Sequence, residues 1–514
     1  MLACALLLSL AAPAGAAPTG PLPGLGQFFD QQLDWGPCAD FARTDIDREA
    51  YANPQYDCAY LDVPLDYGDP DGAVARIAML RQKALDPAAR VGSLFVDPGG
   101  PGGSGVSFLP ALAGLIGEGE VAQRFDLIGF DPRGVGVSEP TIDCSTTEEV
   151  DAERADLDVD TSSEGVAQTE QEFQELALRC ADRVGEDVLA NVGTRDVARD
   201  LQVAHEVVGD DKLSYVGYSY GTSIGAEFAE QFPEEVRALV LDGAVDPALG
   251  PVESRTTQSR GFQRAFDNFA TFCVAQASCP LGTDVPAASA RVQELLKPLI
   301  DAPVPTTDPA GRTLGYNDGV TGLIQALYAE SLWGPLLDGL TQLTQRDGTN
   351  LLILADIYYD RAPDGSYGNL LEAFPVISCV DSDRLTDRDV ALQVSRTNLE
   401  LAPFLDGGFG PSNALELCSF WPVPPTSEPG PVDAPGLPTV LVASSTGDPA
   451  TPYEDGVSLA QQMAARLLTV ENDSHTVVLQ GVNACADEVT TRYLVDLTLP
   501  TADLTCARQP APAG

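Results

Sequence analysis

The feature that most constrains the fold is a regular alternation of short, apolar, β-rich runs with helix-length spacers between residues 75 and 245. The five runs occupy residues 76–80, 93–96, 126–130, 213–217 and 238–241. Continuous apolar strands separated by helices are typical of a parallel sheet that is covered on both faces. After this region, strand-like sequence patterns occur again only at residues 439–443 and 467–470. The sequence therefore predicts one mostly parallel α/β sheet whose chain is interrupted by a long insertion.

The insertion sets the expected domain organisation. Residues 18–250 form the N-terminal part of the core, and residues 436–514 return to it. The sequence between them, residues 251–435, is predicted to be mainly helical and rich in loops. Open α/β sheets bind ligands outside the carboxyl ends of their strands. We expect the insertion to form a helical cap over that edge.

The first residues predict export from the cell. Residues 1–17 contain an apolar run followed by an Ala-Gly-Ala-Ala segment, which is typical of a cleaved signal peptide. The run is too short to span a bilayer as a helix, and no later segment is long and apolar enough to do so. The expected location is secreted or extracellular, with association with the cell envelope left open.

Cysteine usage agrees with export. Removing Cys4 with the signal peptide leaves ten of the eleven cysteines, an even number that suggests disulfides in an exported chain. Pairing each cysteine with its neighbour would join Cys38 with Cys58, Cys144 with Cys180, Cys273 with Cys279, Cys379 with Cys418, and Cys485 with Cys506. Many other connectivities are open to ten cysteines, and the sequence does not choose among them.

The motif Gly-Tyr-Ser-Tyr-Gly carries the first chemical prediction. It places Ser219 between Gly217 and Gly221, directly after an apolar strand and directly before the expected helix of residues 222–231. A sharp turn at this junction lifts a serine hydroxyl clear of the sheet, and the glycines leave room for it. The alternative is an ordinary glycine-bounded turn. The context favours an α/β-hydrolase fold with Ser219 as nucleophile.

A glycine-rich loop at residues 97–105 predicts an oxyanion hole. It follows the strand at 93–96, where hydrolases of this kind supply one backbone N–H to the oxyanion, and the residue after the nucleophile supplies the other. We assign the donors to Gly100 and Tyr220, with Gly99 or Gly102 as alternatives to Gly100. A phosphate-binding loop is disfavoured because the Gly-Lys-Ser/Thr ending is absent.

The base and its acid are expected near the C-terminus. The chain has two histidines, and only His475 follows Ser219, in the order Ser, acid, His that this fold uses; His205 lies in a helical run. Asp448 follows the strand at 439–443 and is the predicted acid. Asp242, at the end of an earlier strand, is the competitor, and Asp473 is too close to His475 in sequence.

Several segments together resemble a known family. They are Asp-Pro-Arg-Gly-Val-Gly-Val-Ser at 131–138, the glycine-rich loop, Gly-Tyr-Ser-Tyr-Gly-Thr at 217–222, Cys-Val-Asp at 379–381 and Gly-Asp-Pro-Ala-Thr-Pro at 447–452. The first looks like the corresponding turn of proline iminopeptidases. The combination, over roughly residues 30–506, resembles the secreted bacterial tripeptidyl aminopeptidases. One departure is Asp473-Ser474 before His475, where that family often has a glycine.

The resemblance implies an exopeptidase that releases short peptides, often tripeptides, from free N-termini, with a helical cap. Such an enzyme must bind an ammonium group, and a carboxylate would do so by a charge-assisted hydrogen bond. Asp381 and Glu330 are the candidates. The rival functions are a carboxylesterase or lipase-like enzyme with the same machinery, and a non-catalytic binding protein on the same fold.

The amino-acid composition disfavours several classes of binding partner. The chain carries 76 acidic and 29 basic residues, a net charge of −47, which disfavours binding to nucleic acid phosphates and anionic membranes. Two histidines and the absence of a Cys-x-x-Cys pair disfavour a metal site, and the mechanism needs no cofactor. The expected partners are peptides with a free N-terminus.

Overall fold

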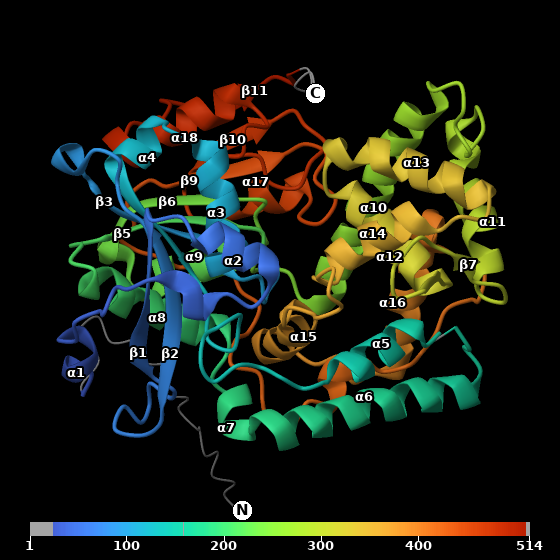
Figure 1. The fold of residues 1–514 in the computed structure, drawn as a ribbon, viewed down its shortest axis with the longest axis horizontal. Coiled ribbons are helices and arrows are strands. Elements are labelled where there is room, and N and C mark those ends of the chain that lie inside the picture. Colours follow the sequence, from blue (N-terminus) through green and yellow to red (C-terminus); the bar gives the residue numbers. More distant parts are fainter. Residues whose placement is uncertain (1–23, 158, 510–514) are drawn as a thin grey trace, which may run out of the picture.

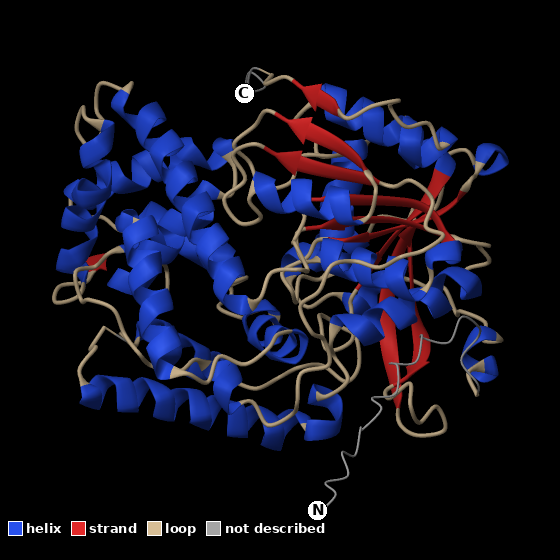
Figure 2. Cartoon of the chain, turned by 180° about the vertical axis from the view of Figure 1, so that it is seen from behind, coloured by secondary structure: helices blue, strands red, loops and turns tan. Residues whose placement is uncertain are grey.

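The structure is a computed structural model that describes residues 24–157 and 159–509. The predicted signal peptide, with Cys4, lies outside the described residues. The described chain contains a nine-stranded sheet in the order β1-β2-β4-β3-β5-β6-β9-β10-β11 (Figures 1 and 2). Its strands are β1 (Tyr56–Pro64), β2 (Val74–Gln82), β3 (Gly92–Asp97), β4 (Phe125–Phe130), β5 (Leu213–Tyr218), β6 (Val236–Asp242), β9 (Leu441–Ser445), β10 (Arg466–Val470) and β11 (Leu504–Cys506).

Each predicted strand is present, but the sheet has two further strands. From β4 through β11 the strands are parallel, whereas β2 runs antiparallel to both of its neighbours. Strand β1 was not predicted because it carries Asp57 and Asp62 and ends in a proline, features that suit an edge strand. Strand β11 is only three residues long, which is too short to give a pattern.

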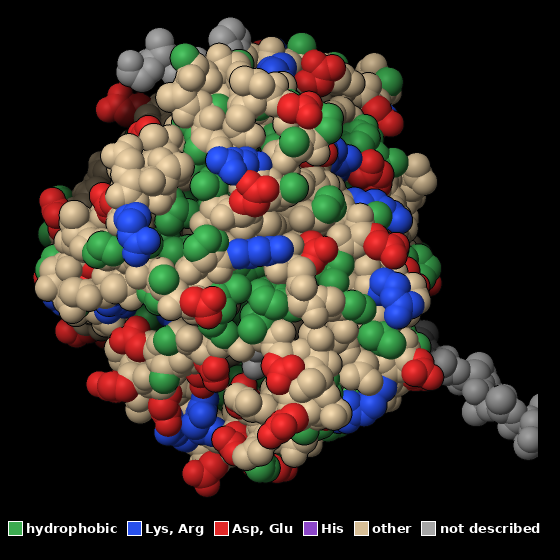
Figure 3. All heavy atoms as spheres, turned by 90° about the vertical axis from the view of Figure 1, so that its right-hand side faces the viewer, with side chains coloured by type: hydrophobic (Ala, Val, Ile, Leu, Met, Phe, Trp, Pro, Cys, Tyr) green, Lys and Arg blue, Asp and Glu red, His purple; other side chains and the backbone are tan. Residues whose placement is uncertain are grey.

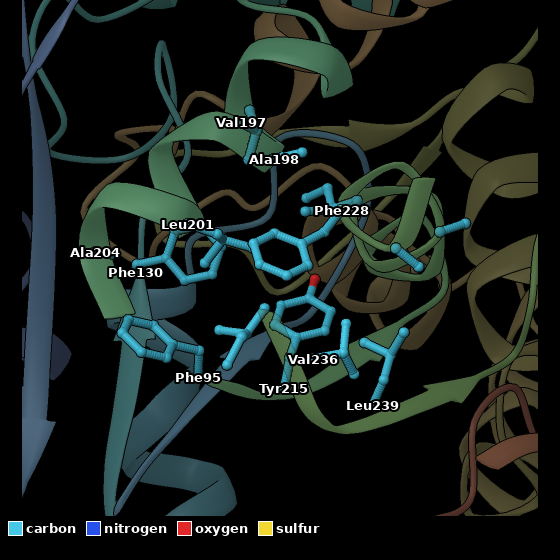
Figure 4. Packing of buried hydrophobic residues seen from close by; sticks show 14 of the residues in the cluster. Phe95, Phe130, Val197, Ala198, Leu201, Ala204, Tyr215, Phe228, Val236 and Leu239 are labelled. Carbon is cyan, nitrogen blue, oxygen red and sulfur yellow. The ribbon is translucent and has the colours of Figure 1, made fainter. Parts of the chain in front are cut away.

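Both faces of the sheet are covered by helices, as the continuous apolar strands predict. On one face Phe95, Tyr215 and Leu239 pack against α8 (Thr194–Val207) and α9 (Gly221–Gln231), as Figure 4 shows. On the other face the alternate strand residues, such as Val96, pack against α3 and α18. These helices span Gly105–Ile116 and Ala484–Asp496. Because successive strand residues face opposite sides, a strand buried on both faces must be apolar throughout.

The cap is a group of helices between β6 and β9 that lies beside one edge of the core (Figure 1). Its main helices are α10 (Pro251–Val274), α11 (Ala288–Leu296), α12 (Tyr316–Leu327), α13 (Trp333–Thr344), α14 (Thr349–Tyr358), α15 (Leu370–Asp381) and α16 (Arg388–Leu401). They enclose an apolar core of their own that includes Phe266, Phe269 and Trp333. Figure 3, which faces the cap side, shows acidic and basic side chains interspersed over it.

Two helices outside the predicted insertion also pack against it. Helix α5 (Thr147–Ala155) and helix α6 (Ser163–Val184) follow β4, within the segment that the sequence assigns to the core. Arg154 of α5 donates to Asp318 of α12 at 2.8 Å, and Arg388 of α16 donates to Glu170 of α6 at 2.7 Å. We therefore propose that α5 and α6 belong to the cap together with residues 251–435. Nothing in their local sequence distinguishes them from core helices.

The neighbour pairing of cysteines is confirmed. The described residues contain the disulfides Cys38–Cys58, Cys144–Cys180, Cys273–Cys279, Cys379–Cys418 and Cys485–Cys506. Each joins segments that are also neighbours in the fold, so the pairs cross-link local units rather than distant parts of the chain.

A buried ion pair ties the middle of the sheet to its first strands. The guanidinium of Arg133 donates to both carboxylate oxygens of Asp200, at 2.6 and 2.8 Å, and both side chains are almost fully buried. The same guanidinium donates to the backbone oxygens of Pro64, Leu65 and Asn191. All of its N–H groups are used, which is the condition under which a buried arginine is tolerated.

We expect Arg133→Met to lower the free energy of unfolding by about 3–5 kcal/mol, because it leaves the Asp200 carboxylate buried without its partner. Urea unfolding at pH 7 measures the change. Arg76→Met is the matched control, since Arg76 forms an exposed pair with Glu139 and its loss should cost at most about 1 kcal/mol. Equal losses in the two variants would contradict the assignment.

Candidate active site

Ser219 lies in a strained turn between β5 and α9. Its φ angle is +55°, a left-handed conformation that is uncommon for a residue with a side chain and that recurs at functional sites. A Cβ atom on Gly217 would lie 2.3 Å from the backbone oxygen of Gly221, so no larger residue fits there. The Ser219 amide donates to the backbone oxygen of Asp242 at 2.9 Å. The turn that the motif predicts is therefore present, and it is fastened to the end of β6.

The glycine-rich loop packs directly on this turn. A Cβ atom on Gly99 would lie 2.4 Å from the oxygen of Tyr218 and 2.8 Å from the amide nitrogen of Tyr220. Gly99, Gly100 and Gly102 all have positive φ angles, of +92°, +115° and +95°. The loop can approach the turn so closely only because these residues have no side chain.

The hydrogen bonds of the loop discriminate among the candidate donors. The Gly99 amide donates to the Asp97 carboxyl at 2.9 Å, so it is already used. Within the described chain, the amides of Gly100, Gly102 and Tyr220 donate to no protein group. Gly102 abuts α15, where a Cβ atom on it would lie 2.8 Å from the Cβ of Ala373. Gly100 also lies against α15, where a Cβ atom on it would be 3.2 Å from Leu370. The hydrogen bonds therefore exclude Gly99 and leave Gly100 or Gly102, together with Tyr220, as candidate oxyanion donors.

His475 and Asp448 form a hydrogen-bonded pair. The Nδ1 atom of His475 lies 2.9 Å from each carboxylate oxygen of Asp448, which is fully buried. Asp448 also accepts from the amides of Ala450 and Thr451, at 3.0 and 2.9 Å, and from the Thr451 hydroxyl at 3.1 Å. The carboxylate is thus held in one orientation, with its charge matched by donors.

The pair sets the protonation behaviour of the imidazole. Burial alone lowers the pKa of His475, but the charge and the hydrogen bond of Asp448 more than offset it and raise the pKa above its usual value of 6.5. The cap contributes to the position of the ring. The His475 amide donates to the Tyr328 oxygen at 2.7 Å, and the two rings meet edge to face at 5.4 Å.

Asp242, the alternative candidate for the acid, has different hydrogen-bond partners from Asp448. Its Oδ2 atom accepts from the amides of Val477 and Val478 at 2.6 and 2.8 Å, and among the described residues it makes no hydrogen bond to His475. Burial raises the pKa of Asp242 to about 7, although the two amides lower it and the Asp448 charge raises it. Its carboxyl therefore holds the loop that follows the base, and Asp448 is the partner of the imidazole.

Ser219 and His475, the predicted nucleophile and base, both lie close to the end of β6. Asp242 binds the Ser219 amide through its backbone oxygen, and a Cβ atom on the next residue, Gly243, would lie 3.2 Å from Cε1 of His475. In the described chain the Ser219 hydroxyl makes no hydrogen bond to His475. Asp448 occupies Nδ1, so Nε2 is the nitrogen left for the hydroxyl. Such bonds are often long without substrate and shorten in the complex.

The two candidate ammonium ligands differ in what surrounds them. Asp381 accepts from the amide of Thr194 at 2.9 Å, from the Thr194 hydroxyl at 2.5 Å and from the Tyr220 hydroxyl at 3.3 Å. Burial raises the pKa of Asp381 to about 6, against the lowering effect of these bonds. Its two oxygens are therefore occupied by protein donors behind the nucleophile turn.

Glu330 lies on the other side of the base. Its amide donates to the Ser474 hydroxyl at 3.3 Å, next to His475. Its carboxylate binds Arg508, which also donates to Asp473 at 2.7 Å. Burial raises the pKa of Glu330, and the Arg508 charge opposes that change. The carboxylates of Glu330 and Asp473 thus share the Arg508 cation near the segment that carries His475, and the sequence spacing does not indicate this arrangement.

The remaining candidates lie outside this site. His205 is buried in α8, where its ring nitrogens contact the Asp210 backbone and Gln202. A cavity of about 220 Å³ behind α15 is lined by Glu372 and Trp421, among others, and by none of the candidate catalytic residues. Over residues 24–157 and 159–509, no cluster of three or more His, Cys, Asp or Glu could hold a metal ion, and no helix could span a membrane.

The order of the strands, with a Gly-x-Ser-x-Gly turn after the central strand β5, defines an α/β-hydrolase, and the predicted fold class is confirmed. A sequence model of the family described as TAP-like protein matches residues 405–506, which contain Asp448 and His475. The serine protease Hip1 of Mycobacterium tuberculosis is 44% identical over 490 residues, covering 93% of this chain and 91% of its own.

Two further relatives match over similar lengths. Carboxylesterase B of M. tuberculosis is 43% identical and covers 97% of this chain and 95% of its own. The tripeptidyl aminopeptidase of Streptomyces lividans is 31% identical and covers 88% of this chain and 84% of its own. The chain therefore belongs to the TAP-like family of serine hydrolases, and the resemblance inferred from its motifs is confirmed.

We expect the rate of Ser219 labelling by a fluorophosphonate to rise with pH and to reach half its maximum above pH 6.5. The neutral imidazole is the base, and Asp448 raises its pKa. Asp448→Asn should slow labelling about 10⁴-fold, because the ring loses its orientation and tautomer. The midpoint should also move to lower pH, since burial then acts without the opposing charge.

The control for this measurement is Asp473→Asn, which removes a carboxylate two residues from the base that does not contact the ring. Its midpoint should match that of the unsubstituted enzyme. A midpoint that stays in place in Asp448→Asn, in folded protein, would contradict the assignment of Asp448.

Proposed function

We propose that this chain is a secreted serine exopeptidase that releases short peptides, chiefly tripeptides, from free N-termini. Ser219, His475 and Asp448 are its catalytic residues. The observation that carries the proposal is the Asp448–His475 pair close to the strained turn at Ser219. The amides of Gly100 and Tyr220 next to this turn donate to no group in the described chain. The names of two relatives, a serine protease and a tripeptidyl aminopeptidase, support a peptide substrate.

The proposed reaction is acyl transfer through a covalent intermediate. Nε2 of His475 removes the Ser219 proton as the hydroxyl oxygen attacks the scissile carbonyl carbon. The amides of Gly100 and Tyr220 stabilise the negative charge that develops on the carbonyl oxygen. The imidazolium, stabilised by Asp448, then donates its proton to the departing amine. Water attacks the acyl-enzyme with His475 again as base, which releases the peptide acid and restores Ser219.

The cap would confine the enzyme to chain ends. Helix α15 packs against the glycine-rich loop, where Leu370 approaches Gly100, and Tyr328 contacts the base from α12's C-terminal end. A covered site of this kind admits an end of a peptide more readily than the middle of a folded chain. We propose Glu330 as the ligand of the substrate ammonium, because its amide binds Ser474 next to the base, whereas Asp381 accepts from Thr194 behind the nucleophile turn. The substrate ammonium would have to replace or share the Arg508 guanidinium that now binds the Glu330 carboxylate.

Secretion is part of the proposal. The predicted signal peptide at residues 1–17 supports export. The five disulfides of the described chain are typical of proteins that work outside the reducing cytosol.

A carboxylesterase is the second candidate, because a relative with that name matches almost as well as the protease. Ester and amide hydrolysis use the same nucleophile, base and oxyanion hole, so the catalytic residues do not separate them. A non-catalytic binding protein on this fold is the third candidate. It would not react with a fluorophosphonate.

Tripeptidyl anilides with a free N-terminus should be cleaved at least ten times faster, by kcat/KM, than the same peptides with an acetylated N-terminus. The ammonium of the blocked peptides is absent, which removes a charged hydrogen bond worth about 1.5–3 kcal/mol. Ser219→Ala should abolish turnover and labelling alike. A preference for acetylated peptides, or activity on simple esters alone, would contradict the exopeptidase.

Glu330→Gln should raise KM for free tripeptidyl anilides about tenfold and leave the acetylated peptides unaffected, because only the former carry the ammonium charge. Asp381→Asn should not show this selectivity, since its oxygens serve Thr194 and Tyr220. Glu488→Gln, at an exposed pair with Arg492, controls for the loss of one acidic charge. Equal effects of Glu330→Gln on both substrate sets would exclude Glu330 as the ligand.

A further inference from the structure

Asp97 occupies the junction between the two parts of the oxyanion hole. It is the last residue of β3, it pairs in register with Gly217 of β5, and it is 1% exposed. Its Oδ1 atom accepts from the Gly99 amide at 2.9 Å. A Cβ atom on Gly221 would lie 2.8 Å from the same oxygen. One carboxyl oxygen therefore contacts both the glycine-rich loop and the first residue of α9.

The second oxygen of this carboxyl has no partner. Oδ2 of Asp97 is buried and, in the described chain, accepts no hydrogen bond. The nearby Tyr215 hydroxyl donates elsewhere, to the Gly221 oxygen at 2.8 Å. The Tyr220 hydroxyl donates to Asp381.

Among residues 24–157 and 159–509, the titratable groups that face Asp97 carry no positive charge. They are Asp131 at the end of β4, Tyr215 on β5 and Tyr220 before α9. A bare carboxylate in such a place would be desolvated, half unbonded and next to another acid, and each of these conditions disfavours the charged form. Burial, with the Asp131 charge, raises the pKa of Asp97 to about 8, although the Gly99 amide lowers it.

We propose that Asp97 is a positioning residue that works as a neutral carboxylic acid and holds the glycine-rich loop against the nucleophile turn. As a neutral acid, its carbonyl oxygen fixes Gly99, which sets the direction of the next amide, that of Gly100. Loss of its proton would place a negative charge close to the oxyanion that the two amides must stabilise. The inference rests on the proposed oxyanion hole but not on the choice between peptide and ester substrates.

This role predicts an alkaline limit to acylation. In the unsubstituted enzyme the rate of fluorophosphonate labelling should fall as pH rises through about 8, where Asp97 ionises. Asp97→Asn keeps the acceptor for Gly99 and cannot ionise, so its rate at pH 7 should lie within about threefold of the parent and should not fall in that range. Asp97→Ala frees the Gly99 amide and should lose about 10²-fold at pH 7, the size of effect of a lost oxyanion donor.

The thermal stability gives a second, independent measure. A carboxyl with a pKa of about 8 in the folded state and about 4 in the unfolded state makes its full contribution to the free energy of unfolding only below pH 4. That contribution is lost progressively as pH rises to 8. The Tm of Asp97→Asn relative to the parent should therefore increase between pH 5 and pH 8. Asp126→Asn is the control, because Asp126 pairs with Arg90 near the opposite end of the sheet. The Tm of Asp126→Asn should lie below that of the parent, because the ion pair with Arg90 is lost, and the alkaline limit should remain.

Three results would overturn the proposal. One is an alkaline limit that persists unchanged in Asp97→Asn. Another is a folded Asp97→Asn that is as slow at pH 7 as Asp97→Ala. The third is a difference in Tm between Asp97→Asn and the parent that does not depend on pH. Failure of the exopeptidase proposal would appear instead in the peptide panel, with labelling intact.

Discussion

The close approach of three backbone segments, at the ends of β3, β5 and β6, is the constraint on which the site depends. Gly99 lies against Tyr218 and Tyr220, Gly217 lies against Gly221, and the Ser219 amide binds the Asp242 oxygen. Neither Gly99 nor Gly217 has space for a Cβ atom. Backbone packing therefore places Ser219 and the amides of Gly100 and Tyr220, which we propose as the oxyanion donors. Donors fixed in this way would need no reorganisation when the oxyanion forms.

Buried carboxyl groups at the ends of strands hold the loops around the candidate active site by hydrogen bonds to backbone amides. Asp97, Asp131, Asp242 and Asp448 follow or end four different strands, and each accepts backbone amides from a neighbouring loop. Of these four, only Asp448 forms a hydrogen bond with His475 in the described chain. The acidity of the chain is thus not confined to its solvated surface. On the protein surface such carboxyls would contribute only to solubility. At this edge of the sheet they orient loops, because they accept hydrogen bonds from backbone amides. The environment of each decides whether it keeps its proton.

We propose that substrate selectivity comes from contacts of the cap, because the nucleophile, base and oxyanion hole do not separate esters from amides. Tyr328 and Glu330 reach the base from the cap, Leu370 reaches the glycine-rich loop, and Arg508 from the C-terminal tail binds the carboxylates of Glu330 and Asp473. The core machinery is compatible with esters and amides alike. The difference between the named relatives, a protease, an esterase and an aminopeptidase, is therefore to be sought in these cap contacts rather than in the catalytic residues.

The sequence by itself determined the parallel core, the serine turn and the glycine-rich loop, because these follow from local patterns of burial, backbone freedom and spacing. It suggested the neighbour pairing of the cysteines without excluding other connectivities, and the structure contains that pairing. Only the tertiary structure decided the rest. It added β1 and β11, whose patterns are too polar or too short, and it placed α5 and α6 against the cap. It also showed that Asp448 rather than Asp242 binds the imidazole, and that the Gly99 amide is already hydrogen-bonded whereas the Gly100 amide is not. The sequence could not decide these points, because the hydrogen-bond partners of a polar group depend on contacts between residues far apart in the chain.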